Sequence, residues 1–75
     1  MKMRTSYFTL GQSHVCRFNG QTLDHDCVIK ITAEDPRAVM FEYFGSHWGF
    51  EYDNEPEMEY FPRGIYNLTE NKWEN

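Results

Sequence analysis

Long apolar runs, basic charge and cysteine are all scarce in this sequence of 75 residues. A helix that spans a bilayer needs about 20 consecutive apolar residues, and no such run is present. The apolar stretch that follows Lys2 and Arg4 is too short for a signal peptide. We therefore expect a cytoplasmic protein with no membrane association, in which Cys16 and Cys27 stay reduced.

Basic residues are outnumbered, and the formal net charge is −5. Residues 1–50 carry five acidic and five basic side chains, whereas residues 51–75 carry seven acidic and two basic ones. The last third of the chain therefore supplies the whole imbalance. Direct binding to nucleic acid is not expected, because no basic stripe is available to displace counterions from phosphates.

Signatures of catalysis are also missing. No glycine loop for phosphate, no set of oxyanion donors and no buried pair of acids can be recognised, and a cysteine near a histidine is too little to define a nucleophile. The segment Asp53-Asn54-Glu55 lacks the glycine and the distal glutamate of an EF-hand calcium loop. We expect a protein that is not an enzyme.

Aromatic residues, in contrast, are abundant, with thirteen in the chain. A chain of this length buries only about 60% of its unfolded surface, so its core is marginal. Each aromatic side chain buries roughly 150 to 250 Å² and compensates for this. We expect a single domain over residues 1–75 with an aromatic-rich core, as a monomer or as a homodimer that shares the core.

One helix is predicted over residues 35–44. Asp35 is suited to accept hydrogen bonds from the first turn, Pro36 fits the first helical position, and Gly45 fits the position after the end. Between these ends, three apolar residues recur at helical spacing: Met40, Phe41 and Phe44. A helix this short is not stable alone, so it must pack on a β-sheet.

Strands are predicted on both sides of the helix. Residues 6–10 alternate with Phe8 and Leu10 on one face, and residues 28–33 alternate with Ile29, Ile31 and Ala33 toward the core. A further strand is expected over 47–53, where Trp48, Phe50 and Tyr52 alternate with Gly49, Glu51 and Asp53, and a short edge strand is expected to end near Leu68. Residues 69–75 should fray. The order ββαββ predicts an α+β fold, with the helix packed on a three- or four-stranded, mainly antiparallel sheet.

The segment between the first two strands contains two pairs of metal-ligand type: His14 with Cys16, and His25 with Cys27. Asn19-Gly20 predicts a two-residue hairpin turn, in which Phe18 pairs with Gln21, Cys16 with Leu23 and His14 with His25. All four side chains would then project from one face. The two sulfurs, however, would lie about 14 Å apart in this register, which opposes a single tetrahedral zinc site and a disulfide. No cofactor is expected, with zinc at these four residues as the alternative.

A second pattern is a row of acids at every second position: Glu51, Asp53, Glu55, Glu57 and Glu59. In an extended chain they would form one negative edge that binds a basic protein surface or imitates the phosphates of a nucleic acid. Two other interpretations stay open. The charges could protect an edge strand from aggregation, or Pro56 could break the row into a solvated loop.

Three segments resemble a group of small, uncharacterised proteins encoded by bacteriophages and prophages. They are YFTLGQ at residues 7–12, MFEYFG with HWGFEY at residues 40–52, and YFPRGIYNL at residues 60–68. The resemblance implies a protein made in an infected cell, but it brings no activity with it. Proteins of that context commonly bind and disable a host enzyme or an immune complex.

We therefore expect a small, acidic, phage-type interaction protein. In this hypothesis the acidic row binds and inhibits a host or defence protein that has a basic surface. The alternatives are a metal- or small-ligand-binding module at His14, Cys16, His25 and Cys27, and a structural accessory protein of a phage.

Overall fold

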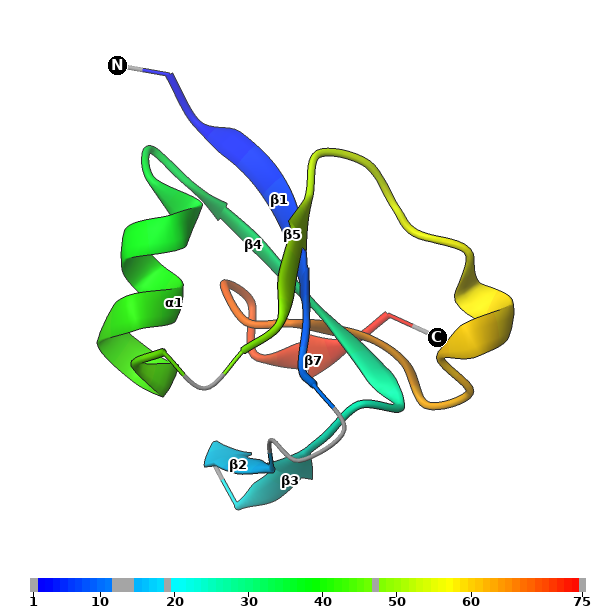
Figure 1. The fold of residues 1–75 in the computed structure, drawn as a ribbon. Coiled ribbons are helices and arrows are strands. Elements are labelled where there is room, and N and C mark those ends of the chain that lie inside the picture. The colour runs from blue at the N-terminus through cyan, green and yellow to red at the C-terminus, as the bar shows by residue number, and fades with distance from the viewer. Residues whose placement is uncertain (1, 12–14, 19, 47, 75) are drawn as a thin grey trace.

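The computed structural model describes residues 2–11, 15–18, 20–46 and 48–74. Its strands are β1 (Arg4–Thr9), β2 (Cys16–Phe18), β3 (Gln21–Leu23), β4 (Cys27–Ala33), β5 (Phe50–Tyr52), β6 (Gly64–Asn67) and β7 (Lys72–Trp73). The α-helix α1 (Pro36–Phe44) follows β4, and a single 3₁₀ turn, η1 (Met58–Tyr60), lies between β5 and β6. Figure 1 shows this arrangement.

The main sheet has five strands in the order β5-β1-β4-β6-β7, and β2 and β3 form a separate hairpin. The predicted α+β class with one helix and a mostly antiparallel sheet is confirmed. The predicted count of three or four strands and the simple ββαββ order are wrong. The difference arises because the last residues of the chain add β7 beside β6, and because the segment predicted as a hairpin loop contains two short strands, β2 and β3, that pair apart from the main sheet.

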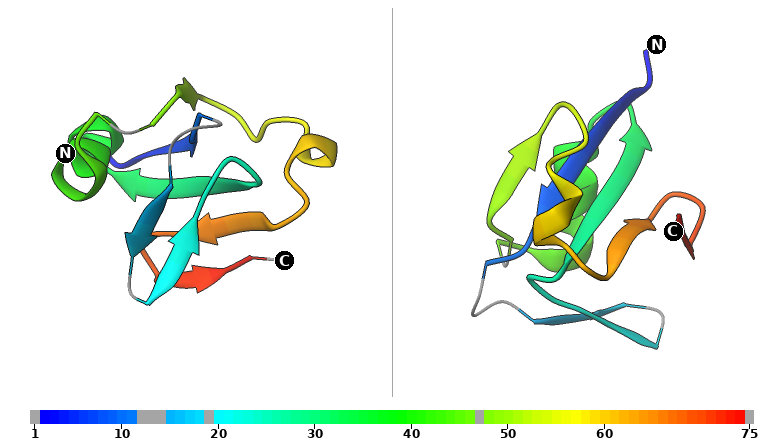
Figure 2. Two further views of the ribbon diagram at one scale, coloured as in Figure 1. Left: turned by 60° about the horizontal axis from the view of Figure 1, so that its bottom comes forward. Right: turned by 90° about the vertical axis from the view of Figure 1, so that its right-hand side faces the viewer.

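Two connections cross the sheet, one over each face. Strand β4 is antiparallel to β1, β1 is antiparallel to β5, and β4 is parallel to β6. The chain therefore runs from β4 through α1 to β5, and then from β5 through η1 to β6, between strands that point the same way. Figure 1 and the right-hand view of Figure 2 show α1 and η1 on opposite sides of the sheet.

The helix begins and ends at the predicted residues. The carboxylate of Asp35 accepts a hydrogen bond from the Ala38 amide at 3.2 Å, and Pro36 is the first residue of α1. Gly45 has φ of 63°, and its amide donates to the Phe41 carbonyl. Only the place of Phe41 differs from the prediction. Its side chain is 51% exposed, because it lies on the flank of the helix rather than on the buried face.

The core lies between the sheet and a layer made of α1 and the β2–β3 hairpin. Its buried members are Phe8, Leu10, Leu23, Cys27, Ile29, Ile31, Met40, Phe44, Tyr66 and Leu68. Phe18 of β2 joins the parts of the layer, since its ring lies 5.2 Å from Tyr43 and 6.0 Å from Phe44 of α1, and 6.2 Å from Tyr66 of β6. The hairpin thus covers sheet surface that one short helix leaves open.

The C-terminal segment, which we expected to fray, contains β7. Trp73 pairs with Tyr66, and the Glu74 amide donates to the Ile65 carbonyl at 2.8 Å. The turn before β7 has Asn71 in the left-handed conformation, at φ of 56°. Its side-chain oxygen accepts a hydrogen bond from the Tyr66 hydroxyl. Asparagine tolerates the left-handed conformation better than most residues, and this side-chain bond ties the turn to β6.

Candidate functional site

The acidic row does not lie along a single strand. Strand β5 ends at Tyr52, so Glu51 is the only member of the row that is part of the sheet. The Glu51 side chain is turned toward α1, and its carboxylate lies 3.9 Å from the Arg37 guanidinium. Glu51 is thus paired with Arg37, and the other four acids of the row lie beyond the end of the strand.

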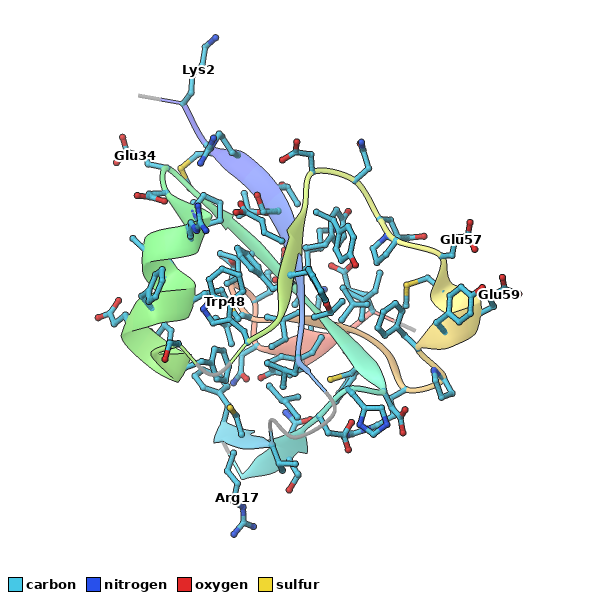
Figure 3. The ribbon with its side chains drawn as sticks, viewed as in Figure 1. Lys2, Arg17, Glu34, Trp48, Glu57 and Glu59 are labelled. Carbon is cyan, nitrogen blue, oxygen red and sulfur yellow. The ribbon has the colours of Figure 1, made fainter. Side chains whose placement is uncertain are left out.

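The remaining four acids are exposed: Asp53, Glu55, Glu57 and Glu59. They follow the connection from β5 to η1, which crosses the face of the sheet opposite α1 (Figure 2). Figure 3 shows Glu57 and Glu59 pointing outward from η1. From residue 49 to residue 62 the sequence has five acidic residues and no basic one. The connection therefore carries four exposed acids and no basic residue, although it is not an extended edge.

Exposed aromatic rings alternate with these acids. Phe50 is 65% exposed and Tyr52 38% exposed on β5, and Tyr60 is 68% exposed on η1. Because side chains alternate along a strand, a Glu51 that faces α1 places both β5 rings on the other face of the sheet. We call residues 50–60 the acidic–aromatic segment.

The exposure of Phe50 and Tyr52 was not predicted from the sequence. Their alternation with acidic residues was used only to predict a strand. The available signal was the single predicted helix, because one helix covers only one face of a sheet. A strand such as β5, with an acid between two aromatics, must then expose one of the two kinds. Which kind is exposed depends on the partner of the acid, here Arg37.

The predicted register of the hairpin is confirmed where the structure describes it. Cys16 lies opposite Leu23, Arg17 opposite Thr22 and Phe18 opposite Gln21. Gly20 has φ of +79°, as the second residue of the predicted turn requires. His14 lies outside the described residues, so its predicted pairing with His25 stays a prediction.

The two cysteines occupy different sheets and form no disulfide. Cys27 is buried at the start of β4, and its thiol donates to the Asp24 carbonyl at 3.3 Å. Burial raises the pKa of the Cys27 thiol above its ordinary value, and it also raises the pKa of Cys16. Both groups are therefore held as neutral thiols, which are poor nucleophiles.

No group of three or more potential metal ligands gathers within the described residues. His25 is exposed, and its Nε2 lies 3.2 Å from the Asp26 carboxylate rather than beside a cysteine. The zinc site at His14, Cys16, His25 and Cys27 stays a prediction, since one of its four members is outside the described residues.

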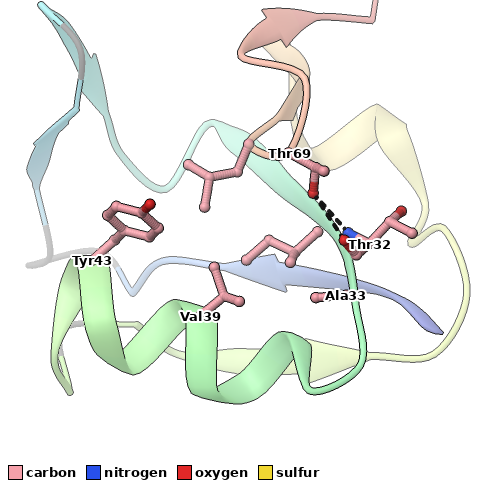
Figure 4. A pocket seen from close by; sticks show the side chains of 7 residues that line it. Thr32, Ala33, Val39, Tyr43 and Thr69 are labelled. Atoms are coloured by element: carbon pink, nitrogen blue, oxygen red, sulfur yellow. Dashed lines mark hydrogen bonds between the residues drawn. The ribbon is translucent and has the colours of Figure 1, made fainter. Parts of the chain in front are cut away.

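A shallow groove of about 200 Å³ lies between α1 and the end of β4 (Figure 4). Its lining is Ile31, Thr32, Ala33, Val39, Tyr43, Leu68 and Thr69. The Thr69 hydroxyl already accepts from the Thr32 amide at 2.9 Å, in the place where β6 no longer accompanies β4. The groove carries no charged side chain and is smaller than the roughly 300 to 1,000 Å³ of typical ligand sites. It offers little for recognising a small molecule.

Comparison of the chain with protein-family models, with curated proteins and with solved structures found no match. Over the part of the chain that the structure describes, no helix is long and apolar enough to cross a membrane.

Proposed function

We propose that the protein is a non-enzymatic interaction protein that binds a partner protein with a basic surface. The binding residues in this proposal are Asp53, Glu55, Glu57 and Glu59, while Glu51, the fifth acid of the predicted row, lies beside Arg37. The observation that carries it is the acidic–aromatic segment, where four exposed acids and three exposed aromatic rings occur together without a basic residue. The phage resemblance of the three sequence segments suggests a host or defence protein in the cytoplasm as the partner, which is inhibited when bound.

The combination of acids and aromatics favours a basic protein as the partner. Carboxylates attract lysine and arginine over several ångströms and accelerate the encounter. Aromatic rings then hold the same cations at short range, with about 0.5 to 2 kcal/mol for each cation–π contact. Exposed rings also supply apolar area, which gives an interface more affinity than exposed charges alone.

The test is a charge-neutral triple variant, Glu55→Gln, Glu57→Gln and Glu59→Gln, used to capture partners from host cells. Each partner that the wild-type protein captures should bind the variant at least tenfold more weakly, since three exposed charges would lose their partners. Raising the salt concentration should weaken wild-type binding more than variant binding, because salt screens exposed charges. Affinity is measured with the purified partner by calorimetry.

The matched control removes three other exposed acids, with the changes Glu34→Gln, Glu42→Gln and Glu70→Gln. This variant has the same net charge as the first one and should bind nearly as tightly as the wild type. Equal weakening by the two triple variants would show that total charge matters and that the acidic–aromatic segment does not.

A further inference from the structure

Strand β5 forms one edge of the main sheet and has few of the features that usually protect an edge strand. Its outer side pairs with no strand among the described residues. Natural edges are blocked by lysine, proline, a bulge or a covering element. Strand β5 instead reads Phe-Glu-Tyr, and its one charge is turned toward α1 and paired with Arg37. The shortness of the strand and this single charge are therefore the two features that oppose the pairing of another chain with it.

Exposed aromatic side chains border this edge on both faces of the sheet. Phe50 and Tyr52 lie on the face opposite α1. On the helix side, the half-exposed Phe41 packs on Trp48 at 5.6 Å, directly before β5. The side chains of an added strand would point alternately to the two faces, so each set would meet aromatic surface. Contiguous exposed apolar surface is a feature of protein–protein interaction sites.

The charges select between two possible occupants of the edge. If a second copy paired antiparallel about the middle of β5, Glu51 would face its own counterpart, and like charges opposite each other destabilise a sheet. The acidic connections from β5 to η1 in the two copies would also lie close together and repel each other. A segment rich in lysine or arginine meets none of this repulsion and is attracted by Asp53 and Glu55.

We propose that the edge of β5 binds an extended basic segment of the partner, which adds to the sheet as a sixth strand. The backbone of β5 supplies the hydrogen bonds, and the rings of Phe50 and Tyr52 contact the cationic side chains of the segment. This inference rests on the proposed function, since it specifies the conformation in which a basic partner is recognised.

The probe is a fluorescein-labelled peptide of about ten residues in which arginine and valine alternate, a length that covers β5 and both its flanks. Its control peptide has proline in place of valine, which keeps the charge but excludes strand pairing. Two protein variants, Phe50→Lys and Tyr60→Lys, replace equally exposed rings of the acidic–aromatic segment with the same charge. Only Phe50→Lys places a lysine on the edge strand. Because both rings are mostly exposed, both variants should fold, which melting curves verify.

We expect the arginine–valine peptide to bind the wild-type protein. Phe50→Lys should reduce the affinity for this peptide about tenfold or more beyond the reduction that Tyr60→Lys causes. The proline peptide should bind the wild type at least tenfold more weakly. Binding of the arginine–valine peptide should also slow hydrogen exchange of the amides in residues 50–52.

Three results would overturn the inference. Equal losses in the two lysine variants, together with equal binding of the two peptides, would mean that the acids act without strand addition, and the proposed function would still stand. A wild-type dimer that Phe50→Lys converts to monomers would assign the edge to a second copy. Failure of the arginine–valine peptide to bind at about 1 mM would exclude strand addition, while partner capture tests the proposed function separately.

Discussion

Trp48 joins three parts of the molecule through one indole ring. Its Nε1 donates to the Gly45 carbonyl at the end of α1 at 3.1 Å, and its ring packs edge-to-face on Phe8 of β1 at 5.2 Å. The Arg37 guanidinium lies 5.7 Å from the centre of the same ring, and Figure 3 shows Trp48 between α1 and β5. The residue therefore sets where the chain leaves the helix and enters β5.

The change Trp48→Phe tests the hydrogen bond of this indole separately from its packing. Phenylalanine keeps most of the aromatic contact but loses the hydrogen bond to the exposed Gly45 carbonyl, so stability should fall by about 0.5 to 1.5 kcal/mol. Trp48→Ala should cost about 3 kcal/mol or more, because the contact with Phe8 is lost as well. Urea unfolding measures both values. Equal losses in the two variants would show that packing contributes little beyond the bond.

Glu74 shows how one side chain ties the end of the chain to the sheet. Its carboxylate accepts from the side-chain amide of Asn67 at 2.6 Å and from the Lys30 ammonium at 3.2 Å. These two donors, Asn67 first, lower the pKa of Glu74 below its ordinary value of 4.5. The same hydrogen bond raises the pKa of Lys30 above 10.5.

The sign of the pH effect follows from these pKa directions. The Glu74 pKa is lower in the folded than in the unfolded state, so its stabilisation is present above about pH 4.5 and is lost as the pH falls through the folded pKa. The stabilisation of the folded state that Lys30 contributes is lost only as the pH rises above 10.5. Glu74→Gln should lower stability at neutral pH by about 1 kcal/mol or less and flatten the loss in acid. Urea melts between neutral pH and acid measure this, with Glu70→Gln as the control.

At the scale of elements, the hairpin, β6 and β7 are held together by Arg63. Its guanidinium donates to the Thr22 carbonyl at 2.6 Å, lies 3.3 Å from the Asp24 carboxylate and stacks on the Trp73 ring at 5.1 Å. Its backbone amide donates to the Asp26 carbonyl. Lysine has neither the planar stack nor the forked donors, so it does not replace arginine here.

Arg63→Lys should therefore destabilise the protein by about 1 to 2 kcal/mol, with the transition midpoint lowered and the denaturant slope unchanged. The control is Arg17→Lys, because the Arg17 side chain points away from the hairpin into solvent (Figure 3) and its loss should change stability by less than about 0.5 kcal/mol. If Arg63→Lys lowers the free energy of unfolding no more than Arg17→Lys does, Arg63 does not hold the hairpin to β6 and β7.

Elements with local signals were predicted well from the sequence. The ends of α1 depend on Asp35, Pro36 and Gly45 themselves, and the hairpin register depends on the turn at Gly20. Strand β7 was not predicted, because its two residues pair only after β6 is in place. A strand of two residues is too short to show the alternation of apolar and polar residues by which strands are recognised in a sequence.

At the scale of the whole molecule, α1 and the hairpin share one face of the sheet, while the η1 connection crosses the other face. This division follows from size, because a chain of this length has too few elements to cover both faces fully. The uncovered rings of Phe50 and Tyr52 are the result. The candidate site thus lies on a part of the sheet that neither α1 nor the hairpin covers within the described residues.

The sequence by itself determined the ends of α1, the register of the hairpin, the α+β class and the acidic character of residues 51–59. Each of these depends on neighbouring residues or on composition. Only the tertiary structure decided the parallel pairing of β4 with β6 and the turning of Glu51 toward Arg37, which leaves Phe50 and Tyr52 exposed. These features depend on contacts between segments far apart in the chain, and the local preferences of single residues do not determine such contacts.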